Sequence, residues 1–315
     1  MLGKTGLKVS VLGLGGSSLG GVFRNVDEAA GIRTVHAALD LGINFIDVSP
    51  FYGITRAETV LGKAVKGVPR DKYYLATKVG RYGQTEFDFS ADRVSASVDE
   101  SLHRLGIDVI DIIQCHDIEY GDLDQVIHET IPALRRLQEK GKVRFIGITG
   151  FPLKIFRYVL DRVQVDTILT YCHYSLNNTS LGTLLPKLEQ KQVGIINASP
   201  LSMGLLTDRG TPEWHPATEE IKMVCAKAAA YCRERGTDIA KLALQFALAN
   251  ARVHTTLIGT ANPENLKKNV KWLESEVDEE LLAEVLEILG PIRDKTWVIP
   301  GQVCSDLEDP LGSCP

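Results

Sequence analysis

Four polar residues that follow short apolar runs are of the types needed for proton transfer: Asp47, Tyr52, Lys78 and His116. A tyrosine hydroxyl has an ordinary pKa of about 10, and a neighbouring cation makes its proton easier to remove. Lys78 is expected to supply that cation and to lower the pKa of Tyr52, with Asp47 holding Lys78. His116 is expected to hydrogen-bond the substrate oxygen. Singly, each residue is better explained as a core, capping or surface residue, but the set predicts a proton-transfer site without a metal.

The runs that precede these residues belong to a repeat of strand and helix patterns. Eight short apolar runs are expected as strands: residues 9–14, 44–48, 73–77, 109–115, 145–149, 167–170, 194–198 and 255–258. Several of them are apolar almost throughout, which is typical of parallel strands buried on both faces. Helical patterns with capping signals lie between them, and a glycine follows those over 27–41, 90–105 and 122–140.

This alternation predicts an α/β fold, a (β/α)8 TIM barrel that spans residues 1–315 as one domain. A doubly wound sheet is the alternative. Three additions are expected: an N-terminal β-hairpin over residues 1–10 at the barrel bottom, a helix over 238–250 and a helix over 278–289. The tail, 301–315, is rich in Gly, Pro and Asp and is expected to be partly disordered. In such a barrel the carboxyl ends of the strands hold the active site, which is where the four polar residues fall.

Composition excludes several function classes. The 315 residues include 35 Lys plus Arg against 40 Asp plus Glu, so no basic excess is available to bind nucleic acid. No apolar run approaches the roughly 20 residues that span a bilayer, and the six cysteines form no CxxC pair. Scattered cysteines are typical of a reduced compartment. We therefore expect a cytoplasmic protein, a monomer or weak homodimer, that binds neither nucleic acid nor membrane.

The stretches GINFIDVSPFYG, ETVLG, LATKVG and IQCHDIE carry a resemblance to a known family. They resemble motifs of the aldo-keto reductase superfamily, whose tetrad of Asp, Tyr, Lys and His is matched in order by the four residues above. The resemblance extends from residue 2 to about residue 273 and implies hydride transfer with a nicotinamide cofactor. Longer stretches such as HDIEYGDLDQVIHETIPAL and INASPLSMGLLTDRG are similar to a plant branch of the superfamily. That similarity implies oxidation of the sugar L-galactose at C1, with NAD, in ascorbate biosynthesis.

The segment IGTANPENLKKN is similar to the family's loop for the adenine end of the cofactor. NADPH-dependent relatives present a lysine and an arginine there, whereas Gly259 and Asn265 stand at these positions here. Each charged phosphate contact contributes about 1.5–3 kcal/mol, so the loss of both favours NAD. Thr260 and the backbone amides from Asn262 onward are expected to cradle phosphate, and Asn269 to contact the adenine.

The nicotinamide side departs further from the family pattern. Thr149 is expected to contact the carboxamide, although Gly150 replaces an asparagine. Tyr171 replaces a glutamine and is expected to take over the stacking role of a tyrosine that is missing at Ala198. Ser199, Leu201 and Gly204 keep the family's pattern for the loop that binds the cofactor's pyrophosphate. Loops in which the walls of the substrate pocket are expected to form contain Phe51, Tyr82, Tyr120 and Trp297.

Two other functions remain open. One is a related aldose or pyridoxal dehydrogenase of the same superfamily. The other is a regulatory barrel that binds nucleotide without turnover, similar to potassium-channel β-subunits. The glycine-rich segment 13–21 is superficially similar to a dinucleotide-binding fingerprint, but no helix begins directly after it. We therefore expect a loop that approaches the substrate closely.

Overall fold

The structure, a computed structural model, describes residues 1–22, 25–299 and 301–302. Its parallel strands close into a barrel in sequence order, and the first pairs with the last. They are β1 (Leu12–Gly15), β2 (Phe45–Asp47), β3 (Tyr74–Val79), β4 (Ile110–Cys115), β5 (Val143–Gly150), β6 (Thr167–Tyr171), β7 (Gly194–Ala198) and β8 (Thr255–Gly259). The closed order confirms the predicted (β/α)8 barrel over the doubly wound alternative. The predicted tail lies, from residue 303 onward, outside the described residues.

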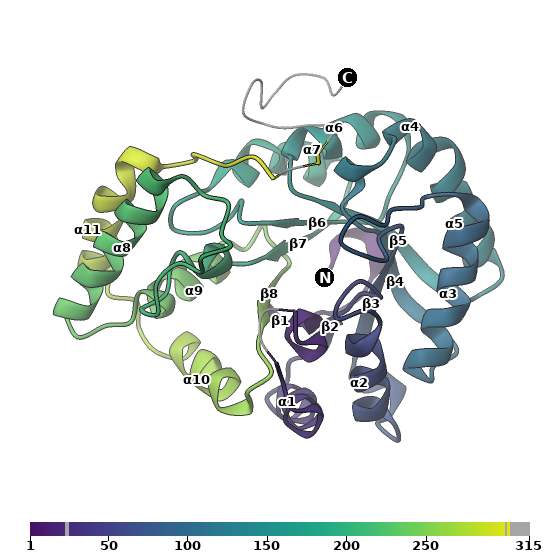
Figure 1. Cartoon of the computed structure of the whole chain (residues 1–315), viewed down its shortest axis with the longest axis horizontal. Coiled ribbons are helices and arrows are strands. Elements are labelled where there is room, and N and C mark those ends of the chain that lie inside the picture. The colour runs from purple at the N-terminus through teal and green to yellow at the C-terminus, as the bar shows by residue number, and fades with distance from the viewer. Residues whose placement is uncertain (23–24, 300, 303–315) are drawn as a thin grey trace.

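Helices surround the barrel (Figure 1). They are α1 (Glu28–Asp40), α2 (Arg56–Val65), α3 (Ala91–Leu105), α4 (Leu123–Gln125), α5 (Ile131–Glu139), α6 (Leu153–Arg162), α7 (Leu185–Gln190), α8 (Glu219–Glu234), α9 (Ile239–Ala249), α10 (Pro263–Leu273) and α11 (Glu279–Leu289). The predicted caps are present: the Asp27 carboxylate accepts from a first-turn amide of α1, and Ser90 does the same for α3. The expected helices over 238–250 and 278–289 are α9 and α11.

The helix predicted over 122–140 is interrupted. Between α4 and α5, residues Val126–Thr130 form a π-helical turn. Pro132 lies in the first turn of α5 and has no N–H to donate. The carbonyl four residues before Pro132 therefore lacks an α-helical hydrogen-bond donor. The helix widens locally into a π turn at this point and then continues as α5.

The first ten residues close the barrel bottom, but the β-hairpin predicted for them is wrong. They contain one short 3₁₀ helix, Gly3–Thr5, and no strand. The Thr5 hydroxyl donates to the Leu2 carbonyl at 2.6 Å, and the Leu2 N–H donates to the Leu7 carbonyl at 2.9 Å. These local bonds favour a tight turn over a strand ladder. Leu2 and Leu7 are buried against residues inside the barrel, including Phe45 and Ile112.

Alternation along the strands decides which side chains reach the barrel interior. On β4, Ile112 packs inside the barrel, whereas Ile113 and Cys115 pack outward against the helices. The same alternation directs Gln114 inward, and Gln114 lies beside Lys78 of β3 in the strand register. Polar side chains on neighbouring strands thus meet inside the barrel near its carboxyl end.

Candidate active site

The structure brings the four predicted residues together at the carboxyl end of the barrel. Asp47 ends β2, Lys78 lies in β3, His116 directly follows β4, and Tyr52 lies in the turn before α2. The Lys78 ammonium forms an ion pair with the Asp47 carboxylate. It also donates to the Val48 carbonyl at 2.9 Å and lies 3.3 Å from the Tyr52 hydroxyl. An ammonium has three protons to donate, so these three acceptors fix its position.

Gln114 completes this cluster and was missed in the sequence. Its side-chain amide donates to the second Asp47 oxygen at 2.7 Å. The carboxylate is therefore held from both sides, by Lys78 and by Gln114. The signal that could have found Gln114 is its place on the inward face of β4, directly opposite Lys78 in the strand register.

The charges of the cluster follow from burial and pairing. Burial opposes the charge of Lys78, but Asp47 and Tyr52 together outweigh burial and raise the pKa of Lys78 above its ordinary value. Burial raises the pKa of Tyr52, and the attraction of Lys78, which acts in the opposite direction, does not offset it. Lys78 thus acts on Tyr52 in the expected direction, but the expectation that the pKa of Tyr52 falls below its ordinary value is wrong. The cause that the sequence does not reveal is the desolvation of the Tyr52 phenolate on burial.

His116 is neutral, and its neighbours select one tautomer. Burial lowers the pKa of His116 to about 3. The Ser49 hydroxyl lies 3.0 Å from Nδ1 of His116 and accepts the Phe51 N–H at 3.1 Å. Its single proton can therefore point to Nδ1, and the Asp117 carboxylate, 3.6 Å from Nε2, favours the ring proton on Nε2. The Tyr52 and His116 rings meet edge to face, with centroids 5.7 Å apart.

The predicted nicotinamide-side residues lie on neighbouring strand ends. Thr149 of β5 is engaged with Asp117: its hydroxyl accepts the Asp117 N–H at 2.9 Å and lies 3.2 Å from the carboxylate. Tyr171 ends β6 and pairs in register with Ala198 of β7. Its ring lies 5.1 Å from that of Phe151. The loop after β7, which carries the predicted contacts Ser199, Leu201 and Gly204, has left-handed backbone at Ser199, Ser202, Met203 and Gly204.

The predicted pocket walls separate into two groups. Phe51 lies 5.8 Å from His116, and Trp297 packs on Phe151 at 5.5 Å, so both adjoin the strand-end residues. Tyr120 stacks on Phe87 at 4.7 Å, and its ring lies 5.4 Å from the Arg81 guanidinium. Tyr82 does not join them. Its ring lies beneath the Arg93 guanidinium of α3 at 3.8 Å, which places it between β3 and the helix layer.

At the adenine-end loop, the groups expected to cradle phosphate are already hydrogen-bonded. The Thr260 hydroxyl accepts the Asn262 N–H at 3.1 Å, and the Asn262 side chain accepts the Glu264 N–H at 2.9 Å. Asn265 and Asn269 are half-exposed, one turn apart on α10, and Gly259 is exposed. These neutral amides and hydroxyls suit a ribose hydroxyl and an adenine edge better than a dianionic phosphate.

Two lysines near this loop are neutralised by carboxylates. Lys267 pairs with Glu264 at 2.9 Å, and Lys268 pairs with Asp238 at 3.2 Å. All four side chains are solvent-facing, which agrees with the exposed helix face expected for the two lysines. Neither of these cations is therefore a free partner for a 2'-phosphate.

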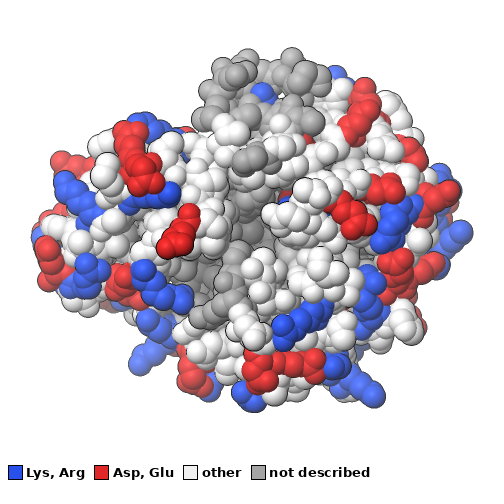
Figure 2. Space-filling model, viewed as in Figure 1, with Lys and Arg blue, Asp and Glu red and all other residues white. Residues whose placement is uncertain are grey.

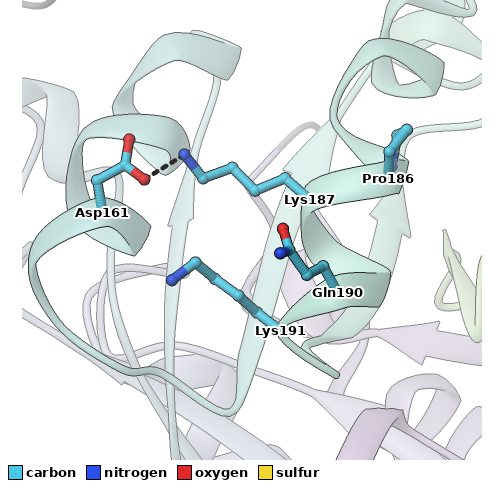
Figure 3. A pocket seen from close by; sticks show the side chains of 5 residues that line it. All are labelled: Asp161, Pro186, Lys187, Gln190 and Lys191. Carbon is cyan, nitrogen blue, oxygen red and sulfur yellow. Dashed lines mark hydrogen bonds and ion pairs between the residues drawn. The ribbon is translucent and has the colours of Figure 1, made fainter.

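The face at the carboxyl end of the barrel is hollowed at its centre, and most charged side chains surround it (Figure 2). A separate surface hollow lies between α6 and α7, where Lys187 is paired with Asp161 and lies beside Gln190 and Lys191 (Figure 3). Gln190 ends α7 and precedes β7, so this hollow is at the amino end of the barrel. It lies on the opposite side from Tyr52 and Lys78.

A family model described as Aldo/keto reductase family matches residues 11–289. The chain belongs to this family. Aldo/keto reductases are oxidoreductases that use a nicotinamide cofactor, and the match includes all four predicted tetrad residues. It confirms the family expected from the sequence motifs.

Individual relatives support the same family. The chain is 54% identical over 305 residues to L-galactose dehydrogenase of Arabidopsis thaliana, covering 94% of this chain and 95% of the relative. It is 33% identical over 275 residues to D-arabinose 1-dehydrogenase of Saccharomyces cerevisiae, covering 82% and 81%. Among solved structures it is similar to the aldo-keto reductase AKR11C1 from Bacillus halodurans in its holo form. The TM-score is 0.76, with 29% identity and coverage of 96% and 98%.

The described part of this aldo/keto reductase contains no helix that is both long and apolar enough to cross a membrane. Within the same residues, no three His, Cys, Asp or Glu side chains gather as a metal site.

Proposed function

We propose that this protein is an NAD-dependent dehydrogenase that oxidises L-galactose at C1 to L-galactono-lactone. The observation that carries the proposal is the buried cluster of Asp47, Tyr52, Lys78 and His116. It lies in a chain that is 54% identical, along almost its whole length, to a plant L-galactose dehydrogenase.

The roles of the side chains follow from their protons. Tyr52 takes the proton of the C1 hydroxyl, and Nε2–H of His116 donates a hydrogen bond to the same oxygen. Lys78 stabilises the phenolate of Tyr52, and Asp47 keeps Lys78 charged and in place. When bound, the nicotinamide cofactor accepts the hydride that leaves C1. Loss of one hydride and one proton converts the hemiacetal carbon into the carbonyl carbon of a lactone.

The remaining contacts extend this proposal. Thr149 and Tyr171 hold the nicotinamide of NAD, and Ser199, Leu201 and Gly204 hold its pyrophosphate. The residues that hold its adenosine half are Gly259, Thr260, Asn262, Asn265 and Asn269. Phe51 and Trp297 supply apolar surface for the sugar. We further propose that the enzyme is cytoplasmic, serves ascorbate biosynthesis and works as a monomer or weak homodimer.

The direct test follows the absorbance of reduced cofactor with purified protein and a panel of L-galactose, D-arabinose and pyridoxal, each with NAD and with NADP. We expect the highest kcat/KM for L-galactose with NAD. A higher value for either other substrate would identify a related dehydrogenase instead. Cofactor binding without turnover of any substrate would favour a regulatory barrel.

The preference for NAD is expected to weaken when two cations are introduced at the adenine-end loop. In the double variant Gly259→Lys, Asn265→Arg, the ratio of kcat/KM for NADP to that for NAD should rise by at least about tenfold, because even one charged phosphate contact contributes about 1.5–3 kcal/mol. A Cβ at Gly259 would meet the Ser17 and Ser18 hydroxyls at 3.4 Å and the Gly15 carbonyl at 3.9 Å, which are ordinary contact distances, so the site accepts the change. The single variant Lys267→Gln is the control, since Lys267 is paired and exposed. An unchanged ratio in the double variant would show that another loop sets the preference.

Ser49→Ala is expected to lower kcat about tenfold, because Nδ1 of His116 loses its donor and the ring can take the wrong tautomer. Ser49→Thr keeps a hydroxyl and should recover most of kcat. Steady-state kinetics with saturating NAD measure both. If alanine and threonine variants lose the same activity, the hydroxyl does not act on His116.

A further inference from the structure

A buried ion pair that the mechanism above does not use lies beside His116. Asp117 directly follows His116 and has left-handed backbone, with φ of 49°. Its Oδ2 lies 3.6 Å from Nε2 of His116 and 2.5 Å from a guanidinium nitrogen of Arg81. The Thr149 hydroxyl lies 3.2 Å from its other oxygen. This carboxylate therefore adjoins the nitrogen that donates to the reacting oxygen.

The pair is charged despite its burial. Only 6% of Asp117 is exposed. Burial opposes its charge, but the cations around it, the Arg81 guanidinium in contact with it and Lys78 farther away, favour the charged form, and the pKa of Asp117 lies below its ordinary value. The Arg81 guanidinium itself lies over the Phe51 ring at 3.9 Å. A buried ion pair contributes little to stability compared with packed apolar side chains. The position of the Asp117–Arg81 pair at the site therefore indicates a role in binding.

We propose that Asp117, oriented by Arg81, accepts a hydrogen bond from the hydroxyl on C2 of the sugar, next to the reacting C1. This inference rests on the proposed sugar oxidation. An ionised carboxylate is an acceptor only, and a sugar hydroxyl is a donor that fits it. The two oxygens of a vicinal diol lie about one hydrogen-bond length apart. A C1 oxygen held by Nε2 of His116 thus brings the C2 hydroxyl within reach of Oδ2, 3.6 Å from that nitrogen.

Two further observations agree with this placement. Asp117 is close enough to Tyr52 to raise the pKa of the Tyr52 hydroxyl. The Asp117 carboxylate therefore lies near the group that takes the substrate proton. Arg81 and Thr149 fix both carboxylate oxygens, so Oδ2 is oriented before a sugar binds. A site of this kind selects substrates with a hydroxyl on the carbon beside the one that reacts, because an analogue without it leaves a buried acceptor short of a donor.

The test compares Asp117→Asn with the unsubstituted enzyme on L-galactose and on 2-deoxy-L-galactose. Asparagine keeps the size of the side chain and removes its charge. We expect kcat/KM for L-galactose to fall at least tenfold, mainly through KM, and the fold loss on 2-deoxy-L-galactose to be at least five times smaller. The difference arises because the 2-deoxy sugar never makes the bond that the variant weakens. Equal fold losses on the two sugars would overturn the proposal and make Asp117 a support for His116.

Arg81→Lys gives a second measurement that does not depend on the folding of the first variant. It keeps a cation but loses the planar guanidinium that holds Oδ2. The same unequal loss on the two sugars is expected, in smaller measure, and equal losses would again overturn the proposal. The unfolding temperature and NAD binding by fluorescence, measured for each variant, show that the barrel is intact.

A failure of the proposed function is distinguishable from a failure of this inference. If the unsubstituted enzyme oxidises no sugar, the proposed function is wrong. The C2-hydroxyl contact is then tested in the reductive direction, with 2-hydroxypropanal and propanal, which differ only by that hydroxyl. A larger loss of kcat/KM for 2-hydroxypropanal in Asp117→Asn supports the contact, and equal losses overturn it.

Discussion

Tyr52→Phe is expected to lower kcat for L-galactose oxidation by about 10²- to 10⁴-fold, the usual contribution of a general base. The substitution removes only the hydroxyl that lies 3.3 Å from the Lys78 ammonium. The aromatic ring, which meets His116 edge to face, is retained. The affinity for NAD should therefore stay close to that of the unsubstituted enzyme. Single-turnover kinetics, with NAD binding measured separately by fluorescence, distinguish the two effects.

Tyr82→Phe is the matched control for this experiment. Tyr82 is also a buried tyrosine, and its hydroxyl accepts the Gly80 N–H at 3.1 Å, but it lies between β3 and α3. Its loss should cost stability, by about 1 kcal/mol, and leave kcat within a few-fold of normal. If Tyr52→Phe retains a tenth of normal turnover, another group takes the proton.

Lys78→Met is expected to reduce kcat/KM at neutral pH by about 10²-fold or more and to move its rise with pH to higher values. Burial already raises the pKa of Tyr52 above its ordinary value, and Lys78 acts against this rise. Removing the ammonium removes the lowering contribution, so the pKa of Tyr52 rises further and less phenolate forms at any given pH. A favourable charge a few ångströms away typically accounts for about 1–3 pKa units. The measurement is log kcat/KM against pH for both proteins.

The control for this prediction removes the unpaired charge that Lys78→Met leaves behind. An isolated Asp47 carboxylate inside the barrel destabilises the fold by about 3–5 kcal/mol. The double variant Lys78→Met, Asp47→Asn has no such charge and should unfold at a higher temperature than the single variant. Its activity should show a smaller alkaline shift, because the Asp47 charge, which raises the pKa of Tyr52, is also gone. If the pH profile of either variant coincides with that of the unsubstituted enzyme, Lys78 does not control the proton of Tyr52.

Most of the barrel could be predicted from the sequence because its elements depend on local signals. Continuous apolar runs identify the strands, and Asp27 and Ser90 identify two helix starts. The failures involve competition between local bonds. The first ten residues alternate too briefly to form a ladder, and the Thr5 hydroxyl closes a turn instead. Pro132 favours the π-helical turn that precedes α5, whereas the hydrophobic periodicity predicts one continuous helix there.

The residues of the candidate site could be predicted from the sequence, but the pKa values of their side chains could not. Residue types at strand ends suffice to select Asp47, Tyr52, Lys78 and His116. The direction of the pKa of Tyr52 depends on how much water its hydroxyl loses, which no spacing in the sequence reports. Partners such as Gln114 depend on strand register, so they become visible only when neighbouring strands are aligned.

The pairing of β1 with β8 has a consequence for how the protein is made. Leu12 of β1 lies opposite Thr256 of β8. During synthesis, β1 therefore cannot pair with β8 until more than 240 further residues have been added. At about 5–20 residues per second, a nascent chain carries an unpaired strand edge for some tens of seconds. Open edges of this kind pair readily with other chains. We therefore expect fragments that end before Thr255 to aggregate or to need chaperones, whereas in the 315-residue chain β8 pairs with β1 and closes this edge.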